Sequence, residues 1–350
     1  MLETLTIRTP DDGHLHLRDG ASLAAVLPHT LERFGRAVVM PNLDPPLTTV
    51  AQVLEYEKRI LRLCPPQSTF KPWMTLYLDA HTSPAEIHEA AAEPAIIGAK
   101  LYPQGVTTGS ASQVTDPLEL MPVYEAMAES GLPLLVHGED PDPATDPYER
   151  ESRFVDRTLV PLCERLPGLR IVFEHVTTRL GVELVRSEAR RMGATITVHH
   201  LLFDRRALFA GGLHPHLYCL PVPKTEADRL ALLEAATGGE PCFFLGTDSA
   251  PHPRSRKECA CAAGGIYSAH AAIELYAEVF EAMDRLERLD DFAGRFAAEF
   301  YGQALNSGQI TLVKDPWRVP DHFPLAEDEL VPLRAASVVP WRLLRQASRV

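Results

Sequence analysis

The chain has 350 residues, of which 45% are apolar and 23% are charged; this is ordinary for a globular protein and long enough for one α/β barrel with insertions or for two smaller domains. Its net charge of -13 argues against nucleic acid or an anionic membrane as a partner, and no apolar run approaches a membrane span. The N-terminus has neither the basic segment nor the apolar core of a signal peptide, and six scattered cysteines form no disulfide framework. We therefore expect a reduced, cytoplasmic protein in which Cys259 and Cys261 are ordinary thiols.

Short apolar or β-branched runs alternate with helical patterns along most of the chain. The pattern predicts strands near residues 13–17, 36–40, 73–78, 95–101, 132–137, 169–175, 194–199 and 242–248. It predicts helices over residues 22–33, 50–63, 84–92, 117–130, 153–165, 179–192, 225–236 and 268–287. Eight strands, most followed by a helix, indicate a closed parallel (β/α)8 barrel of the TIM type rather than an open doubly wound sheet.

Two segments depart from this alternation. Residues 201–223 show no clear helix, and long irregular connections in barrels often carry function. Residues 315–340 are rich in proline, so we expect an irregular C-terminal extension that wraps the barrel. No composition shift marks a boundary, which predicts a single domain over residues 1–350.

The first predicted strand carries two histidines one residue apart. Because residues i and i+2 of a strand face the same side, His14 and His16 could bind one metal ion together. Taken alone, such a pair is more often two half-buried polar residues on a strand than a metal site. Arg18 follows on the same face if the strand continues.

Further polar side chains stand where later strands end. These are Asn42 after the second strand, Lys100 in the fourth, His137 in the fifth, His175 in the sixth, and Asp248 in the eighth with His252 beyond it. Each alone has a structural explanation, such as a bonded core histidine, a solvated lysine or a capping aspartate. In a parallel barrel, however, all strand ends open on one face, where active sites lie. Imidazoles together with a carboxylate there predict a metal site, with zinc favoured.

The set resembles the amidohydrolase superfamily and, more closely, the class II dihydroorotases. The matching strings are residues 12–20 (DGHLHLRDG), 40–42 (MPN), 98–103 (GAKLYP), 214–221 (HPHLYCLP), 246–252 (GTDSAPH), 256–258 (RKE) and 330–333 (LVPL). They are long, specific and spread over most of the chain.

The resemblance implies two zinc ions in each subunit. His14 and His16 would hold the more buried ion, and His137 and His175 the more exposed one. Lys100 would carry a carboxyl group from carbon dioxide, and the resulting carbamate would bridge the two ions. Asp248 would contact the buried ion and act as the catalytic proton shuttle.

The resemblance also implies a substrate pocket. Arg18, Asn42, His137 and His252 would bind the substrate, together with backbone groups of Leu220 and Gly264. The position of Gly264 usually carries another small residue in the family and acts through its main chain. Thr107 and Thr108 would form a lid that hydrogen-bonds the substrate when it closes.

The implied reaction is the reversible closure of N-carbamoyl-L-aspartate to L-dihydroorotate in pyrimidine (UMP) biosynthesis. In the hydrolytic direction, a hydroxide held by the zinc ions would attack the ring carbonyl, and Asp248 would pass its proton to the leaving nitrogen. The partner would thus be a small molecule, with no nucleic acid or membrane involved. Related enzymes are homodimers, so the resemblance implies a homodimer here.

Two other functions remain compatible with the barrel. A hydantoinase or allantoinase would share the metal ligands. However, Arg18, Asn42 and His252 suit the binding of a carboxylate, which favours a substrate with a free carboxylate. A catalytically inactive barrel could serve as a scaffold for a partner enzyme such as a carbamoyltransferase. Such a protein is expected to have lost ligands, and none of the six is missing here.

Overall fold

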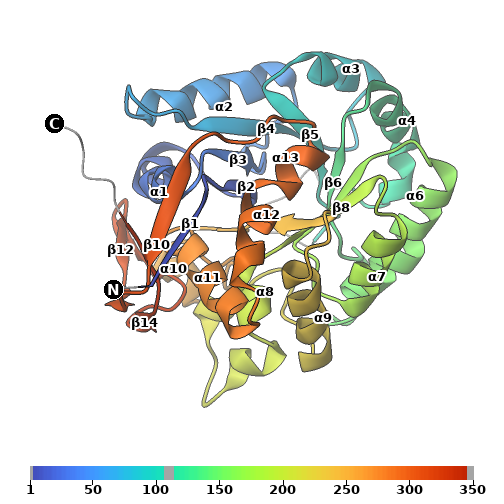
Figure 1. Ribbon diagram of the computed structural model, residues 1–350. Coiled ribbons are helices and arrows are strands. Elements are labelled where there is room, and N and C mark those ends of the chain that lie inside the picture. Colours follow the sequence, from blue (N-terminus) through green and yellow to red (C-terminus); the bar gives the residue numbers. More distant parts are fainter. Residues whose placement is uncertain (1–2, 106–113, 345–350) are drawn as a thin grey trace.

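Eight parallel strands form the centre of the molecule in the computed structural model, which describes residues 3–105 and 114–344. In sheet order they are β2 (Asp11–Leu15), β3 (Arg36–Val39), β4 (Lys71–Leu78), β5 (Ile96–Leu101), β6 (Leu134–His137), β7 (Ile171–Glu174), β8 (Met192–Ile196) and β9 (Phe243–Leu245). The first and last strands meet through backbone hydrogen bonds from His16 N to Ser249 O (3.1 Å) and from Asp248 N to His14 O (2.8 Å). The predicted (β/α)8 barrel is confirmed (Figure 1).

Helices surround the barrel and begin where the sequence supplies caps. The main ones are α1 (Gly20–Arg33), α2 (Val50–Leu63), α3 (Pro84–Ala92), α4 (Met121–Ser130), α7 (Arg179–Ser187), α9 (Glu226–Thr237) and α11 (Ala272–Ala282). Thr49 and Gln52 form a capping box at α2, and Thr225 and Asp228 form another at α9. The Ser83 hydroxyl caps the amino end of α3 by accepting a backbone hydrogen bond.

One end of the barrel is closed by an apolar plug. Helix α13 (Phe296–Phe300) lies across the amino ends of the strands, as Figure 1 shows. Its anchors include a hydrogen bond of 2.6 Å from Arg36, at the start of β3, to the Ala304 carbonyl. The interior cluster at this end comprises Val38, Met40, Trp73, Ile97, Leu135, Val172, Phe244, Phe296, Ala297 and Tyr301. We call these ten residues the barrel floor.

Several predicted boundaries are wrong. The seventh strand was extended to residue 199, but β8 ends at Ile196 and helix α8 (Val198–Leu202) follows. Here the Thr197 side chain accepts a hydrogen bond from His200 N, which caps a helix that apolar periodicity alone did not reveal. The helix predicted over residues 153–165 consists of α5 (Arg150–Phe154), a π-helical turn (Val155–Leu159) and α6 (Val160–Arg165). The helices predicted over 179–192 and 268–287 are shorter, ending at Ser187 and spanning Ala272–Ala282.

The C-terminal extension is more regular than expected. Strand β10 (Gln309–Val313) pairs with β1 (Thr4–Arg8) and β15 (Arg342–Leu343). Shorter antiparallel pairs join β11 (Trp317–Arg318) to β14 (Val338–Val339) and β12 (Phe323–Leu325) to β13 (Asp328–Leu330). Strands of two or three residues are too short to show periodicity, so the sequence could not predict them.

The remaining elements are short helices: α10 (Arg254–Lys257), α12 (Leu289–Gly294) and the 3-10 turns Pro117–Leu120, Arg205–Phe209, Pro215–Leu217 and Leu286–Arg288. Within residues 3–105 and 114–344, no helix has both the length and the apolar character needed to cross a membrane. All six cysteines are free thiols, as expected, and Cys259 and Cys261 are exposed.

Candidate active site

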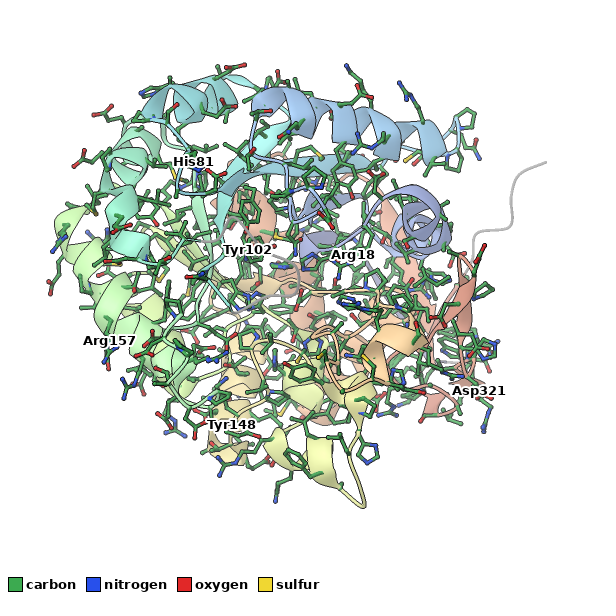
Figure 2. The ribbon with its side chains drawn as sticks, turned by 180° about the vertical axis from the view of Figure 1, so that it is seen from behind. Arg18, His81, Tyr102, Tyr148, Arg157 and Asp321 are labelled. Atoms are coloured by element: carbon green, nitrogen blue, oxygen red, sulfur yellow. The ribbon has the colours of Figure 1, made fainter. Side chains whose placement is uncertain are left out.

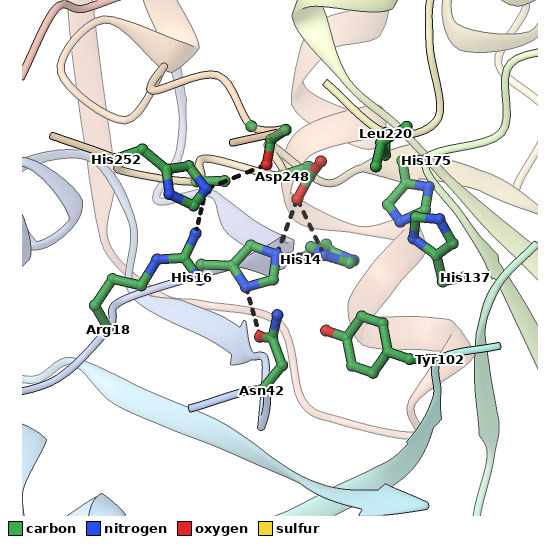
Figure 3. Close-up of a pocket in the computed structure, with 13 residues that line it drawn as sticks. His14, His16, Arg18, Asn42, Tyr102, His137, His175, Leu220, Asp248 and His252 are labelled. Atoms are coloured by element: carbon green, nitrogen blue, oxygen red, sulfur yellow. Dashed lines mark hydrogen bonds and ion pairs between the residues drawn. The ribbon is translucent and has the colours of Figure 1, made fainter. Parts of the chain in front are cut away.

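The six predicted ligand residues meet at the carboxyl ends of the strands. Their exposed fractions are at most 8%: His14 1%, His16 8%, Lys100 0%, His137 2%, His175 1% and Asp248 4%. Five of them line a pocket with about 460 Å³ of empty space, which also contains Arg18, Asn42, Tyr102, Leu220, Ala250, His252, Gly264 and Gly265. Figure 3 shows these side chains converging from different strands, and Figure 2 places Arg18 and Tyr102 near the centre of the ring of helices.

Strand alternation accounts for part of this convergence. Leu135 and His137 are two residues apart on β6, so both face the interior, with Leu135 in the floor and His137 above it. Val172 and Glu174 have the same relation on β7. Each of these two strands therefore supplies an apolar side chain to the floor and a polar one to the layer above it.

Unusual backbone conformations account for the rest. Arg18, His175 and Asp248 have φ of 59°, 42° and 43°, a left-handed region that non-glycine residues seldom occupy. His175 directly follows Glu174, and regular strand geometry would turn the two side chains to opposite faces. The left-handed turn brings the His175 ring into the pocket beside Glu174 instead. Such strain concentrates at functional sites.

One group of donor atoms is formed by His14, His16 and Asp248. The Nε2 atoms of the two histidines are 3.4 Å apart, and they lie 3.3 and 3.1 Å from Asp248 Oδ1. Burial raises the pKa of the Asp248 carboxyl, but hydrogen bonds from both histidines hold it well below its usual range. Burial lowers the pKa of His16 to about 4, which keeps the ring neutral and able to bind a metal at neutral pH.

His137 and His175 form the second group. Their ring centroids are 4.7 Å apart, and the His175 ring lies 5.0 Å from that of His14. Burial lowers the pKa of both rings. Nδ1 of His175 is buried and has no hydrogen-bond partner in the described part of the chain. The resemblance implied that the first group is more buried than the second, but the exposed fractions of the four rings show no such difference.

Lys100 lies between these groups, fully buried. Its Nζ forms a close ion pair with Glu174 Oε2 and lies 5.0 Å from the centroid of the Tyr102 ring. Burial lowers the pKa of the amine, although the charge of Glu174 opposes the shift. An amine with a lowered pKa is more readily neutral and nucleophilic.

Three polar side chains, two of which the sequence did not single out, stand behind the histidine rings. Asn42 Oδ1 lies 2.8 Å from His16 Nδ1, Glu139 Oε2 2.8 Å from His137 Nε2, and Glu174 Oε2 2.9 Å from His14 Nδ1. Glu139 and Glu174 stand beside predicted ligands in the sequence, which is the only signal that could have revealed them. Asn42 was predicted as a substrate contact, and its carbonyl oxygen is already used here.

The predicted substrate residues gather on one side of the pocket. Arg18 donates from Nη2 to His252 Nε2 at 3.1 Å and from Nε to the Pro251 carbonyl at 3.2 Å. Burial and the nearby Arg18 charge lower the pKa of His252 well below its usual range, so its ring is a neutral acceptor. The Gly264 carbonyl lies 3.1 Å from the same His252 nitrogen. The lid residues Thr107 and Thr108 lie outside the described residues.

A third cluster, His199, His200 and Cys219, lies near the pocket but outside its lining. His200 uses both ring nitrogens: Nδ1 accepts from the Thr197 hydroxyl (2.7 Å), and Nε2 donates to the Pro221 carbonyl (3.0 Å). Burial raises the pKa of the Cys219 thiol well above its usual value. His200 and Cys219 therefore hold the chain that carries Leu220, because both contact the Pro221 carbonyl.

Comparison with known proteins agrees with this geometry. An amidohydrolase family model matches residues 55–179. A dihydroorotase of Azoarcus sp. (strain BH72) is 54% identical over 343 residues, which cover 98% of this chain and 100% of that protein. The chain belongs to the dihydroorotase family. It is therefore a cyclic amidohydrolase of the amidohydrolase superfamily, as the resemblance implied.

Two solved dihydroorotase structures share the whole fold. That of Campylobacter jejuni has a TM-score of 0.90 at 34% identity and covers 99% of this chain and 98% of its own. That of Saccharomyces cerevisiae has a TM-score of 0.90 at 33% identity and covers 98% and 99%. Membership of the dihydroorotase family, together with clustered buried imidazoles, a buried carboxylate and the partnerless Nδ1 of His175, supports a metal cofactor.

Proposed function

We propose that this chain is a dihydroorotase, which interconverts N-carbamoyl-L-aspartate and L-dihydroorotate in de novo pyrimidine biosynthesis. The proposal rests on one observation: metal-ligand side chains and a buried cation lie together in one pocket. His14, His16 and Asp248 offer metal ligands, and Arg18 and His252 stand beside them. A metal-ligand set beside a buried cation suits a cyclic amide that bears a carboxylate.

The metal cofactor would be two zinc ions. His14, His16 and Asp248 would hold one, and His137 and His175 the other, with carboxylated Lys100 between them. The lowered pKa of the buried Lys100 amine supports its reaction with carbon dioxide. When bound, the ions would polarise the amide carbonyl and lower the pKa of a water molecule to about 7.

Asp248 would move the proton in this reaction. A carboxylate beside a metal dication would stay ionised at neutral pH. It can therefore accept the proton of the attacking water and return it to the leaving ring nitrogen. In the biosynthetic direction the same carboxylate would remove a proton from the ureido nitrogen.

Arg18, Asn42 and His252 would hold the substrate carboxylate. Because the Asn42 carbonyl oxygen faces His16, its amide NH2 remains to donate to a substrate oxygen. Arg18 is kept in place by its bonds to Pro251 and His252, which present a preorganised guanidinium to the pocket. His137 and the backbones of Leu220 and Gly264 would add contacts, and Thr107 and Thr108 would close over the substrate. The S. cerevisiae dihydroorotase was solved in complex with 5-fluoroorotic acid, which is consistent with recognition of an acid.

A parallel assay tests this assignment. We expect the purified protein to hydrolyse L-dihydroorotate and to leave hydantoin and allantoin essentially unchanged, with about two zinc ions per chain by elemental analysis. Faster turnover of hydantoin would point to another cyclic amidohydrolase. Metal-free protein without any turnover after zinc is supplied would favour the scaffold alternative.

We also propose a cytoplasmic homodimer with a small-molecule substrate as its functional partner. The family resemblance supports the dimer, and the net charge of -13 supports the absence of nucleic-acid partners. Light scattering during size-exclusion chromatography should give twice the 38.7 kDa mass of one chain. A monomer mass at micromolar concentration would contradict the dimer.

A further inference from the structure

Glu174 is a fully buried carboxylate at the carboxyl end of β7, and it touches ligand residues from two other strands. Its Oε2 lies 2.9 Å from Nδ1 of His14 on β2. The same oxygen forms the close ion pair with Nζ of Lys100 on β5. One side chain therefore connects three strands at the centre of the proposed metal site.

The two nitrogens of His14 face different surroundings. Nε2 lies 3.4 Å from His16 Nε2 and 3.3 Å from Asp248 Oδ1, so it points into the donor group. Nδ1 lies 2.9 Å from Glu174 Oε2, within ion-pair distance, although the two atoms are not aligned as a hydrogen bond. A neutral imidazole has one N–H and one lone pair, so Nε2 can bind a metal only when Nδ1 carries the proton. That proton needs an acceptor, and Glu174 Oε2 is the carboxylate oxygen beside it, at 2.9 Å.

Stability does not explain the burial of this carboxylate. Replacing a buried ion pair with apolar side chains is often neutral or stabilising, and Val172 shows that β7 tolerates an apolar residue on the same inward face. The second oxygen of Glu174, Oε1, has no hydrogen-bond partner among the described residues. Glu174 is thus held in the barrel through Oε2, by its contacts with His14 and Lys100.

We propose that Glu174 is a positioning residue that fixes the His14 ring with Nε2 turned to the metal and holds the Lys100 side chain at the centre of the site. The inference rests on the proposed metal site but goes beyond the ligand set. A carboxylate behind a metal-bound histidine sets its tautomer and orientation and raises its basicity. Glu139 stands in the same relation to His137 on the neighbouring strand, at 2.8 Å.

Chelator competition on zinc-loaded protein tests the inference without substrate. We expect Glu174→Ala to weaken zinc binding by about 10- to 100-fold, the usual effect of removing such a partner, with Glu174→Gln in between because its amide oxygen can still accept from Nδ1. The absorption spectrum of cobalt-substituted protein should change in both variants. Glu274→Gln is the matched control, because Glu274 is an equally buried carboxylate that pairs with Arg33 (2.7 Å) away from the ligands. Unchanged zinc affinity and cobalt spectrum in the Glu174 variants would overturn the proposal.

A measurement on the zinc-loaded wild-type protein covers the case in which the variants fail to fold. Nitrogen-15 NMR of labelled histidines should place the His14 proton on Nδ1 and the metal on Nε2. The opposite tautomer would refute the positioning role. Neither experiment uses dihydroorotate, so their failure is distinct from a failure to turn over that substrate.

Discussion

The barrel interior has two layers with opposite chemistry on the same strands. The floor consists of apolar and aromatic residues and is sealed by α13, whereas the layer above it contains histidines, a lysine and carboxylates that are equally buried. On β6 the change takes two residues, from Leu135 to His137, and on β7 from Val172 to Glu174. The difference indicates a division of labour: the floor stabilises the fold, and the upper layer holds buried polar groups that only ligands and each other can satisfy.

The largest effect on turnover is expected from a change of Asp248, the proposed proton carrier in the upper layer. Asp248→Asn keeps the size and an oxygen ligand but cannot accept the proton, so kcat for dihydroorotate hydrolysis should fall between about 10²- and 10⁴-fold. Zinc content and unfolding free energy should stay near those of the wild type. The measurement is steady-state kinetics with elemental analysis, and near-normal kcat would remove Asp248 from proton transfer.

A substitution in the floor should lower stability and leave the kcat of the folded protein largely unchanged. Phe244 is fully buried and its ring packs against those of Phe300 (5.7 Å) and Tyr301 (6.3 Å). Phe244→Ala should lower the free energy of unfolding by about 3–5 kcal/mol through lost burial and a cavity. Urea unfolding gives this value, with Phe244→Leu as a milder control. A large loss of kcat in protein that is still folded would show that the two layers are not separable.

Removal of the Arg18 guanidinium should raise KM more than it lowers kcat. Arg18→Ala loses a charged hydrogen-bond partner of the substrate carboxylate, which is worth about 2–3 kcal/mol, or roughly a 30- to 150-fold rise in KM. Arg18→Lys should recover part of this loss, because it keeps the charge without the planar fork. Kinetics with L-dihydroorotate measure both variants; an unchanged KM in Arg18→Ala would exclude the residue from the pocket.

The smallest effect concerns a buried histidine outside the pocket. His199 has no hydrogen-bond partner for either ring nitrogen among the described residues, and burial lowers its pKa to about 4. Between that value and the ordinary 6.5, the unfolded chain binds more protons than the folded one, so stability falls as pH drops through this window. The share of His199 approaches about 1.4 kcal/mol per pH unit within this window and sums to about 1.6 kcal/mol between pH 6.5 and pH 5.

A His199→Gln variant cannot titrate in this window. Its unfolding free energy, measured in urea at several pH values, should therefore decline less than that of the wild type between pH 6.5 and pH 5. Contributions common to both proteins cancel in the difference. Parallel pH curves would mean that the ring already has a hydrogen-bond partner that neutralises the cost of its burial.

Much of the fold follows from local patterns. The apolar runs predicted all eight barrel strands, and the predicted starts of α2 at residue 50 and α3 at residue 84 are confirmed, with Thr49 and Ser83 as their caps. Strand β1 was missed although Thr4–Arg8 alternates, because it pairs with β10, some 300 residues away in the sequence. The helical nature of residues 198–202 was also missed, since a single turn has too few residues to show a period.

The sequence alone determined which strands carry the six predicted ligands, His14, His16, Lys100, His137, His175 and Asp248. It also determined that they meet, because the carboxyl ends of all strands in a parallel barrel lie on one face. Only the tertiary structure decided that His175 and Glu174 both face the interior, since this depends on a left-handed backbone turn at His175. It alone also decided which atoms stand behind the rings, as in the contact of Glu174 with His14 on the far side of the barrel. Such contacts join residues 160 positions apart in number, and no local preference encodes them; they arise when the closed sheet brings its strands around one axis.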